Sequence, residues 1–200
     1  MFLGVGASAA CSINQLELGM YELLRKVFLR YLRPDPLSLL IKDGLSVGEN
    51  FSMLEGVTID HSHCWHIRIG DDVTLAPNVH VLAHDASTKK FIDCTKLGKV
   101  RIGNRVFVGA STIILPGVTI GNDVIIGAGS VVTSSVPDGV VVAGNPARVL
   151  CSIDQFLKKR EKEKENCPFF VEAYTLERHI TDKMKDEMNS KMGEGFGYIK

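Results

Sequence analysis

The 200-residue sequence predicts an all-β solenoid, with a helix before the coils and a helical extension after them. Three observations support this fold class. β-Branched residues recur at every sixth position through the middle of the chain, turn-forming residues lie between them, and both patterns stop near the ends. Such a repeat indicates a stacked fold, because each unit buries its apolar face only against its neighbours.

The repeat is clearest in the second half of the chain. The residues at every sixth position from 102 are Ile102, Val108, Ile114, Ile120, Ile126 and Val132. A period of six fits neither the 3.6-residue helix nor the two-residue strand repeat, but it suits three short strands per coil with a turn at each corner. We therefore expect these side chains inside a narrow prism. Small or branched residues four positions on should fill the remaining space, namely Val106, Thr112, Val118, Val124 and Ser130.

The same phase places further coils earlier in the chain. Three hexads close one coil, so residues 102–119 and 120–137 are two coils, and Ile69, Leu75 and Val81 begin the hexads of another. A rougher stretch with Val47, Met53 and Ile59 precedes it. Val81 and Ile102 are 21 residues apart, which is not a multiple of six. Residues 86–99 should therefore leave the coil as a protruding loop, a typical place for function.

The two ends of the chain are predicted to be helical. Residues 1–44 should form a cap built on an amphipathic helix at 14–33, ended by Pro34 and Pro36, that covers the open end of the solenoid. The repeat domain spans 45–150. In the extension, 151–200, the segment Ser152–Gln155 has the pattern of a capping box, and a second helix is expected at 175–190.

Composition excludes several classes of partner. Lysine plus arginine and aspartate plus glutamate each number 23, so the balanced charge gives no support for nucleic-acid binding. No apolar stretch is long enough for membrane insertion, and the opening segment lacks the basic start of a signal peptide. Five scattered cysteines without a Cys-x-x-Cys motif favour reduced thiols and a cytoplasmic location.

Four segments carry a resemblance to a known family, namely 102–111, 114–121, 126–133 and the closing Gly-Asn-Pro-Ala-Arg-Val of 144–149. Together they resemble the hexapeptide-repeat acyltransferases. Within that family, residues 45–150 are most similar to maltose, galactoside and nodulation-factor O-acetyltransferases. The resemblance implies a left-handed parallel β-helix, a homotrimer, and acetyl transfer from acetyl-CoA to a hydroxyl of a small-molecule or saccharide acceptor.

The resemblance also implies that His84 is the catalytic base, at the start of the protruding loop. The chemistry requires one, because a sugar hydroxyl is a poor nucleophile until a base within hydrogen-bond reach accepts its proton. An imidazole titrates near neutral pH and can later return that proton to the CoA thiolate. Direct transfer requires no acyl-enzyme. Asp85, next in sequence, and Asp60, from the preceding coil, are both candidates to orient the imidazole.

The remaining expected site residues follow from similarity to the family. Backbone groups around Ala110 and Ala128, with Thr133 nearby, should contact acetyl-CoA, and the Arg148 guanidinium suits its phosphates. Phe107 stands where the family often has tryptophan and would form an aromatic wall for the acceptor. The coil before His84 lacks the family's acceptor-binding asparagine and aspartate, so the acceptor specificity of those enzymes should not be assigned to this chain.

A histidine-rich stretch, 61–66, replaces those acceptor residues. Its side chains include His61, His63, Cys64 and His66, which are typical zinc ligands. A strand would send the first two to one side and the last two to the other, so we expect no metal. Instead, His61, His63 and Trp65 should line the acceptor pocket, with the indole stacked on a sugar face.

Three other functions remain open. A γ-class carbonic anhydrase is also a left-handed β-helix, but its paired histidines are five residues apart, whereas His80 and His84 are four apart. A non-catalytic trimerisation module would leave His84 and the Asn-Pro-Ala-Arg segment unexplained. An N-acetyltransferase would keep the same machinery and change only the atom that accepts the acetyl group.

Overall fold

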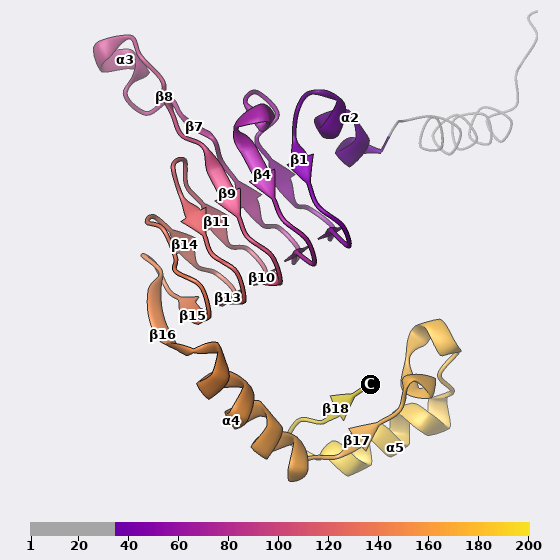
Figure 1. The fold of residues 1–200 in the computed structure, drawn as a ribbon. Coiled ribbons are helices and arrows are strands. Elements are labelled where there is room, and N and C mark those ends of the chain that lie inside the picture. Colours follow the sequence, from indigo (N-terminus) through magenta and orange to yellow (C-terminus); the bar gives the residue numbers. More distant parts are fainter. Residues whose placement is uncertain (1–34) are drawn as a thin grey trace, which may run out of the picture. The chain divides into compact units, whose positions relative to one another are not determined.

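The computed structural model describes residues 35–200, so the helix expected at 14–33 lies outside the described residues (Figure 1). Pro36, expected to help end that helix, instead begins helix α2 (Pro36–Lys42). Proline is tolerated at the first helical position because that N–H has no intrahelical partner. Helix α2 belongs to one unit that ends at Lys42, and residues 43–200 form a second.

Three parallel sheets, visited in rotation, form the body of the second unit (Figure 1). Sheet A contains β1 (Ser46–Val47), β4 (Ile67–Ile69), β9 (Val100–Ile102) and β12 (Thr119–Ile120). Sheet B contains β2 (Ser52–Met53), β5 (Thr74–Leu75), β10 (Val106–Val108), β13 (Val124–Ile126) and β15 (Val140–Ala143), and ends with the antiparallel β16 (Arg148–Ser152). Sheet C contains β3 (Thr58–Ile59), β6 (His80–Val81), β11 (Ile113–Ile114) and β14 (Val131–Val132).

The pairing register confirms three hexads per coil. Ile102 pairs with Ile120, and Ile114 with Val132, each 18 residues later. The side chains at the sixth positions from 102 to 132 are all buried, as are the small or branched residues four positions on. Corner residues adopt positive φ, as expected from turn chemistry. They include Asn50, Asp72, Asn78 and Asp123, together with Gly117 and Gly129.

Two insertions interrupt the coils, and both leave from the corner between sheets C and A. Val47 pairs with Ile69, which is 22 residues later instead of 18, and the extra residues lie between β3 and β4. They form a turn and a 3-10 helix, η1 (Cys64–His66). One coil later, between β6 and β9, β7 (His84–Asp85) and β8 (Lys96–Leu97) make an antiparallel hairpin that protrudes from the stack with α3 (Lys89–Ile92) (Figure 1).

The C-terminal extension is partly as expected. Helix α4 (Ile153–Glu165) begins with the predicted capping box, in which Ser152 and Gln155 bond each other's backbone. Strands β17 (Phe169–Phe170) and β18 (Tyr198–Ile199) pair in parallel. The second helix begins later than predicted, as α5 (Asp182–Met192), because η2 (Glu172–Tyr174) and η3 (Leu176–Arg178) occupy the preceding residues and Thr181 caps the start. No helix in residues 35–200 is long and apolar enough to cross a membrane.

Candidate active site

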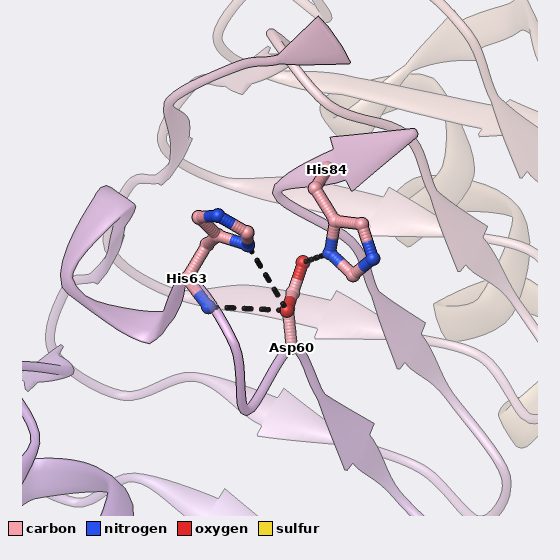
Figure 2. A group of neighbouring side chains, drawn as sticks. All are labelled: Asp60, His63 and His84. Carbon is pink, nitrogen blue, oxygen red and sulfur yellow. Dashed lines mark hydrogen bonds and ion pairs between the residues drawn. The ribbon is translucent and has the colours of Figure 1, made fainter. Parts of the chain in front are cut away.

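A histidine–aspartate pair lies at the corner where both insertions leave the coil. Asp60 directly follows β3, and His84 begins the hairpin three residues after the end of β6 (Figure 2). Because β3 pairs with β6, the two side chains meet although they are 24 residues apart, with 2.5 Å between His84 Nδ1 and Asp60 Oδ2. Stacking of adjacent coils therefore forms this pair.

The carboxylate of Asp60 is buried and has partners at both oxygens. Oδ2 accepts the backbone N–H of Ala83 at 2.9 Å besides contacting His84, and Oδ1 accepts those of Ser62 and His63 at 3.0 and 3.2 Å. Burial favours the neutral acid, but the Ala83 N–H and the adjacent imidazole outweigh it and hold the pKa of Asp60 below its ordinary value. Asp60 is therefore an anion held in one position.

This anion determines which nitrogen of His84 carries the proton. An ionised carboxylate only accepts hydrogen bonds, so Nδ1 must donate to it, and Nε2 then has a free lone pair. No hydrogen bond to Nε2 occurs within the described part of the chain, and the His84 side chain is about one-third exposed. The arrangement can therefore present a neutral imidazole base to a ligand.

Asp85 is placed differently from Asp60. Its Oδ1 accepts the backbone N–H of Ser87 at 2.8 Å within the hairpin, and that bond lowers the pKa of the exposed carboxyl. Nδ1 of His84 is already engaged by Asp60. Of the two predicted partners, the structure thus brings Asp60 to the imidazole, while Asp85 caps a turn at the hairpin base.

The histidine-rich stretch is not a strand, so the predicted alternation of its side chains is wrong. The four extra residues form a turn and η1, which place His63 against the site. Its ring centroid lies 5.0 Å from that of His84 and 5.3 Å from that of Trp65. Trp65 is about half exposed, and His61 is also exposed. His63 and Trp65 thus extend an aromatic row away from the base.

Asp60, His63 and His84 together could hold a metal ion, and we call them the His84 cluster (Figure 2). One donor atom from each lies within 4.8 Å of the others. His63 Nδ1 is buried without a hydrogen-bond partner, 4.0 Å from Asp60 Oδ1. Two imidazoles and a carboxylate are a chemically suitable zinc set. The set differs from the one the sequence suggests, because His61, Cys64 and His66 are not in it.

An open pocket of about 440 Å³ adjoins His84. Its lining residues are Leu82, His84, Asp85, Ala86, Lys96, Leu115, Pro116 and Thr133. Thr133 lines this pocket because of the register of sheet C, in which Val81, Ile114 and Val132 are partners. The residues that follow them, Leu82, Leu115 and Thr133, therefore stack at one corner of the coil. Thr133 is therefore the one predicted acetyl-CoA residue that lines the pocket of the base.

The other predicted site residues lie elsewhere on the chain. Ala110 and Ala128 stack at the next corner, between sheets B and C, where Gly129 N bonds Ala110 O. Arg148 lines a separate pocket of about 350 Å³, together with Ser134 and Ser135. Phe107 points outward from sheet B beside Arg105 and is not among the residues lining the His84 pocket. One chain alone thus does not gather all the predicted residues.

Sequence comparisons identify the family. The model of the bacterial transferase hexapeptide family (six repeats) matches residues 99–134. The chain is 40% identical to Protein CapG of Staphylococcus aureus over 70% of this chain and 83% of that protein. It is 32% identical to the putative acetyltransferase YvoF of Bacillus subtilis (strain 168), over 74% and 76%. Galactoside O-acetyltransferase of Escherichia coli (strain K12) matches at 35% identity over 55% of each chain. The chain therefore belongs to the hexapeptide-repeat acetyltransferases, enzymes that take their acetyl group from acetyl-CoA.

Proposed function

We propose that this chain is an O-acetyltransferase with His84 as general base and a saccharide-like acceptor. Residues 45–150 form its acetyltransferase domain, a left-handed β-helix, between a helical cap at 1–44 and the extension at 151–200. The observation that carries the proposal is the buried Asp60 carboxylate on His84 Nδ1, beside an open pocket. That geometry leaves Nε2 free to accept the proton of a hydroxyl group.

The reaction proceeds by direct transfer. His84 Nε2 accepts the proton of the acceptor hydroxyl as its oxygen attacks the thioester carbonyl. The tetrahedral intermediate expels the CoA thiolate, which takes the proton back from the imidazolium. Asp60 acts in both steps, because its fixed negative charge stabilises the imidazolium while the proton resides there. A backbone N–H at a coil edge would stabilise the oxyanion.

Acetyl-CoA is proposed to lie between two copies of the chain in a homotrimer. Thr133 lines the pocket of the base, whereas Ala110 and Ala128 lie at the adjacent corner of the prism. A long ligand contacts both sets if the corner of one copy faces the neighbouring corner of the next. Arg148, exposed beyond Thr133 along the chain, would bind the phosphates as a guanidinium fork. The oligomer should have three times the 21.9 kDa mass.

The acceptor is proposed to bind on the other side of His84, along His63 and Trp65. An exposed indole beside a base suits a sugar ring, since its faces carry C–H groups that pack on aromatic rings. His61 and Phe107 would complete the acceptor pocket, with Phe107 supplied by a neighbouring copy. The sugar named in the match to galactoside O-acetyltransferase supports this acceptor class. A cytoplasmic location agrees with the free cysteines of the described residues.

The test is thiol release from acetyl-CoA over a panel of saccharides, corrected for hydrolysis without acceptor. Wild type should transfer acetyl to at least one hydroxyl, and His84→Ala should lose about 10²- to 10⁴-fold in kcat. His179→Asn is a matched control, because His179 is exposed in the extension and asparagine tolerates its φ of 58°. Full activity of His84→Ala, or no acetyl-CoA binding at all, would refute the proposal.

A further inference from the structure

Two arginines stand side by side on sheet A. Arg68 on β4 and Arg101 on β9 are register partners on parallel strands, and both side chains are exposed. The neighbours in the same row are Ser46 on β1 and Thr119 on β12, so the row contains no carboxylate. Neither arginine forms an ion pair within residues 35–200. Like charges on adjacent strands destabilise a sheet, which makes this arrangement costly without a ligand.

A pocket of about 250 Å³ gathers these cations around the tryptophan. Its lining residues are Trp65, His66, Arg68, Lys99 and Arg101, and we call it the basic pocket. It contains three permanent positive charges and no acidic side chain. Trp65 lies at the edge of this pocket and is 52% exposed, which is unusual for a large apolar ring. Positive charge beside an aromatic face is a typical binding site for an anion attached to a ring.

A row of aromatic rings links the basic pocket to the proposed active site. Trp65 and His66 belong to the insertion after β3, and Lys99 follows the hairpin that begins with His84, so both insertions rejoin sheet A here. Ring-to-ring steps of 5.0 Å from His84 to His63 and 5.3 Å from His63 to Trp65 connect the base to the pocket. The next step, from Trp65 to His66, is 5.5 Å. A saccharide that packs along this row would carry groups near both the base and the basic pocket.

We propose that the basic pocket binds an anionic group of the acceptor, a phosphate or a carboxylate, so that the substrate is an acidic saccharide. This inference rests on the proposed acetyl transfer by His84. Its sugar ring packs on Trp65 with a hydroxyl near His84 Nε2, and the anion lies one sugar away, between Arg68 and Arg101. Two guanidinium forks on adjacent strands match the several oxygens of a phosphate or carboxylate.

The first experiment measures binding without catalysis. Trp65 is the one tryptophan of the chain, so intrinsic indole fluorescence reports directly on the basic pocket. Inorganic pyrophosphate and glucose 1-phosphate should change this fluorescence saturably at constant ionic strength, while methyl glucoside should bind at least tenfold more weakly. Arg68→Gln/Arg101→Gln should abolish the response. Lys158→Gln/Lys159→Gln removes the same charge from exposed positions of α4 and should leave it intact.

The second experiment measures acetyl transfer to matched acceptors. Glucuronic acid tests the carboxylate and glucose 1-phosphate tests the phosphate, each against methyl glucoside. Arg68→Gln/Arg101→Gln should raise KM for the preferred anionic acceptor by about 10²-fold, since one hydrogen bond to a charged group is worth roughly a factor of ten or more. The kcat, and the KM for acetyl-CoA, should stay unchanged.

Three results would overturn the inference. The first is equal use of neutral and anionic acceptors. The second is a rise in the KM for acetyl-CoA in the double variant, because that would assign the arginines to the CoA phosphates. The third is the lack of any fluorescence response of wild type to an anion. If no saccharide is acetylated, the proposed function fails instead. The fluorescence titration then still decides whether the basic pocket binds anions.

Discussion

Asp60→Asn removes the charge that orients His84 while nearly keeping the side-chain volume. The carboxylate has four partners: Ser62 and His63 N–H groups at Oδ1, and the Ala83 N–H and the imidazole at Oδ2. An amide has only one oxygen, so its –NH₂ group must face one of these two pairs.

The two orientations of the amide have different costs. With –NH₂ at the Oδ1 position, both the Ser62 and His63 bonds are lost. With –NH₂ at the Oδ2 position, one backbone bond, from Ala83, is lost, and His84 Nδ1 must accept a hydrogen bond instead of donating one. Each lost bond to a charged group costs about 1.5–3 kcal/mol. The second orientation is therefore preferred, and it moves the imidazole proton to Nε2, where the base is needed.

The expected result is a loss of about 10²- to 10⁴-fold in kcat, measured as thiol release, with the loss of stability limited to about 1.5–3 kcal/mol in urea unfolding at neutral pH. Asp85→Asn is the matched comparison. Its amide oxygen can still accept the Ser87 N–H, so kcat should change by less than about threefold. An Asp60→Asn enzyme with wild-type kcat, or an Asp85→Asn enzyme as impaired as it, would refute this reasoning.

The pH dependence of stability gives a second readout of the same substitution. The pKa of Asp60 is lower in the folded chain than its ordinary value of 3.8, so the ionised form stabilises the fold. That contribution is complete above the ordinary value and is lost as the pH falls through the lowered one. The difference in unfolding free energy between wild type and Asp60→Asn should be present at about pH 5 and shrink as the pH falls below about 4.

Three further predictions concern the coil and metal binding. Ile114→Ala should lose about 2–5 kcal/mol in urea unfolding, because Ile114 is fully buried in the prism; a loss below 1 kcal/mol would contradict its place in the core. Gly103→Ala should lose about 1–3 kcal/mol, because its Cβ would lie 2.7 Å from the Gly121 backbone; unchanged stability would contradict this close stacking. Removal of metal with EDTA should leave kcat unchanged, because Asp60 alone orients the base; activity lost on dialysis and restored by zinc would instead assign a catalytic metal to the His84 cluster.

The repeated core was the part of the fold most open to prediction. Each buried position, such as Ile114, repeats the same requirement for a branched apolar side chain, so the period survives even where single residues deviate. The stretch 61–66 was harder, because four extra residues there remove the constraint of the coil and replace the expected strand with η1. The start of α5 was displaced for a similar reason, since the cap at Thr181 is a local signal inside an irregular segment.

The residues of the candidate site could be predicted only in part, because their spatial neighbours depend on how the coils stack. His84 could be singled out where the hexad phase breaks, but Asp60 and Asp85 were equivalent candidates. The choice between them is made by the register of β3 on β6, which places Asp60 beside Ala83 and His84. That register depends on where the four residues of the first insertion are accommodated. Phe107 shows the complementary difficulty, because in the proposed trimer it would reach the acceptor from a neighbouring copy, and such contacts leave no trace in the spacing of one chain.

The shared corner of the two insertions explains how the candidate site is accommodated without loss of the coil. An insertion inside a strand would remove ladder hydrogen bonds and shift core residues to the outer face. At a corner it adds mainly loop-closure entropy, about 0.6 kcal/mol for each doubling of loop length. The edges of both insertions remain bound to the coil, since Asp60 N bonds Val81 O and Leu82 N, just before Ala83, bonds Ile114 O. The coil therefore positions the proposed base, while residues farther along each insertion, including Trp65, are not held by the ladder and are proposed to contact the acceptor.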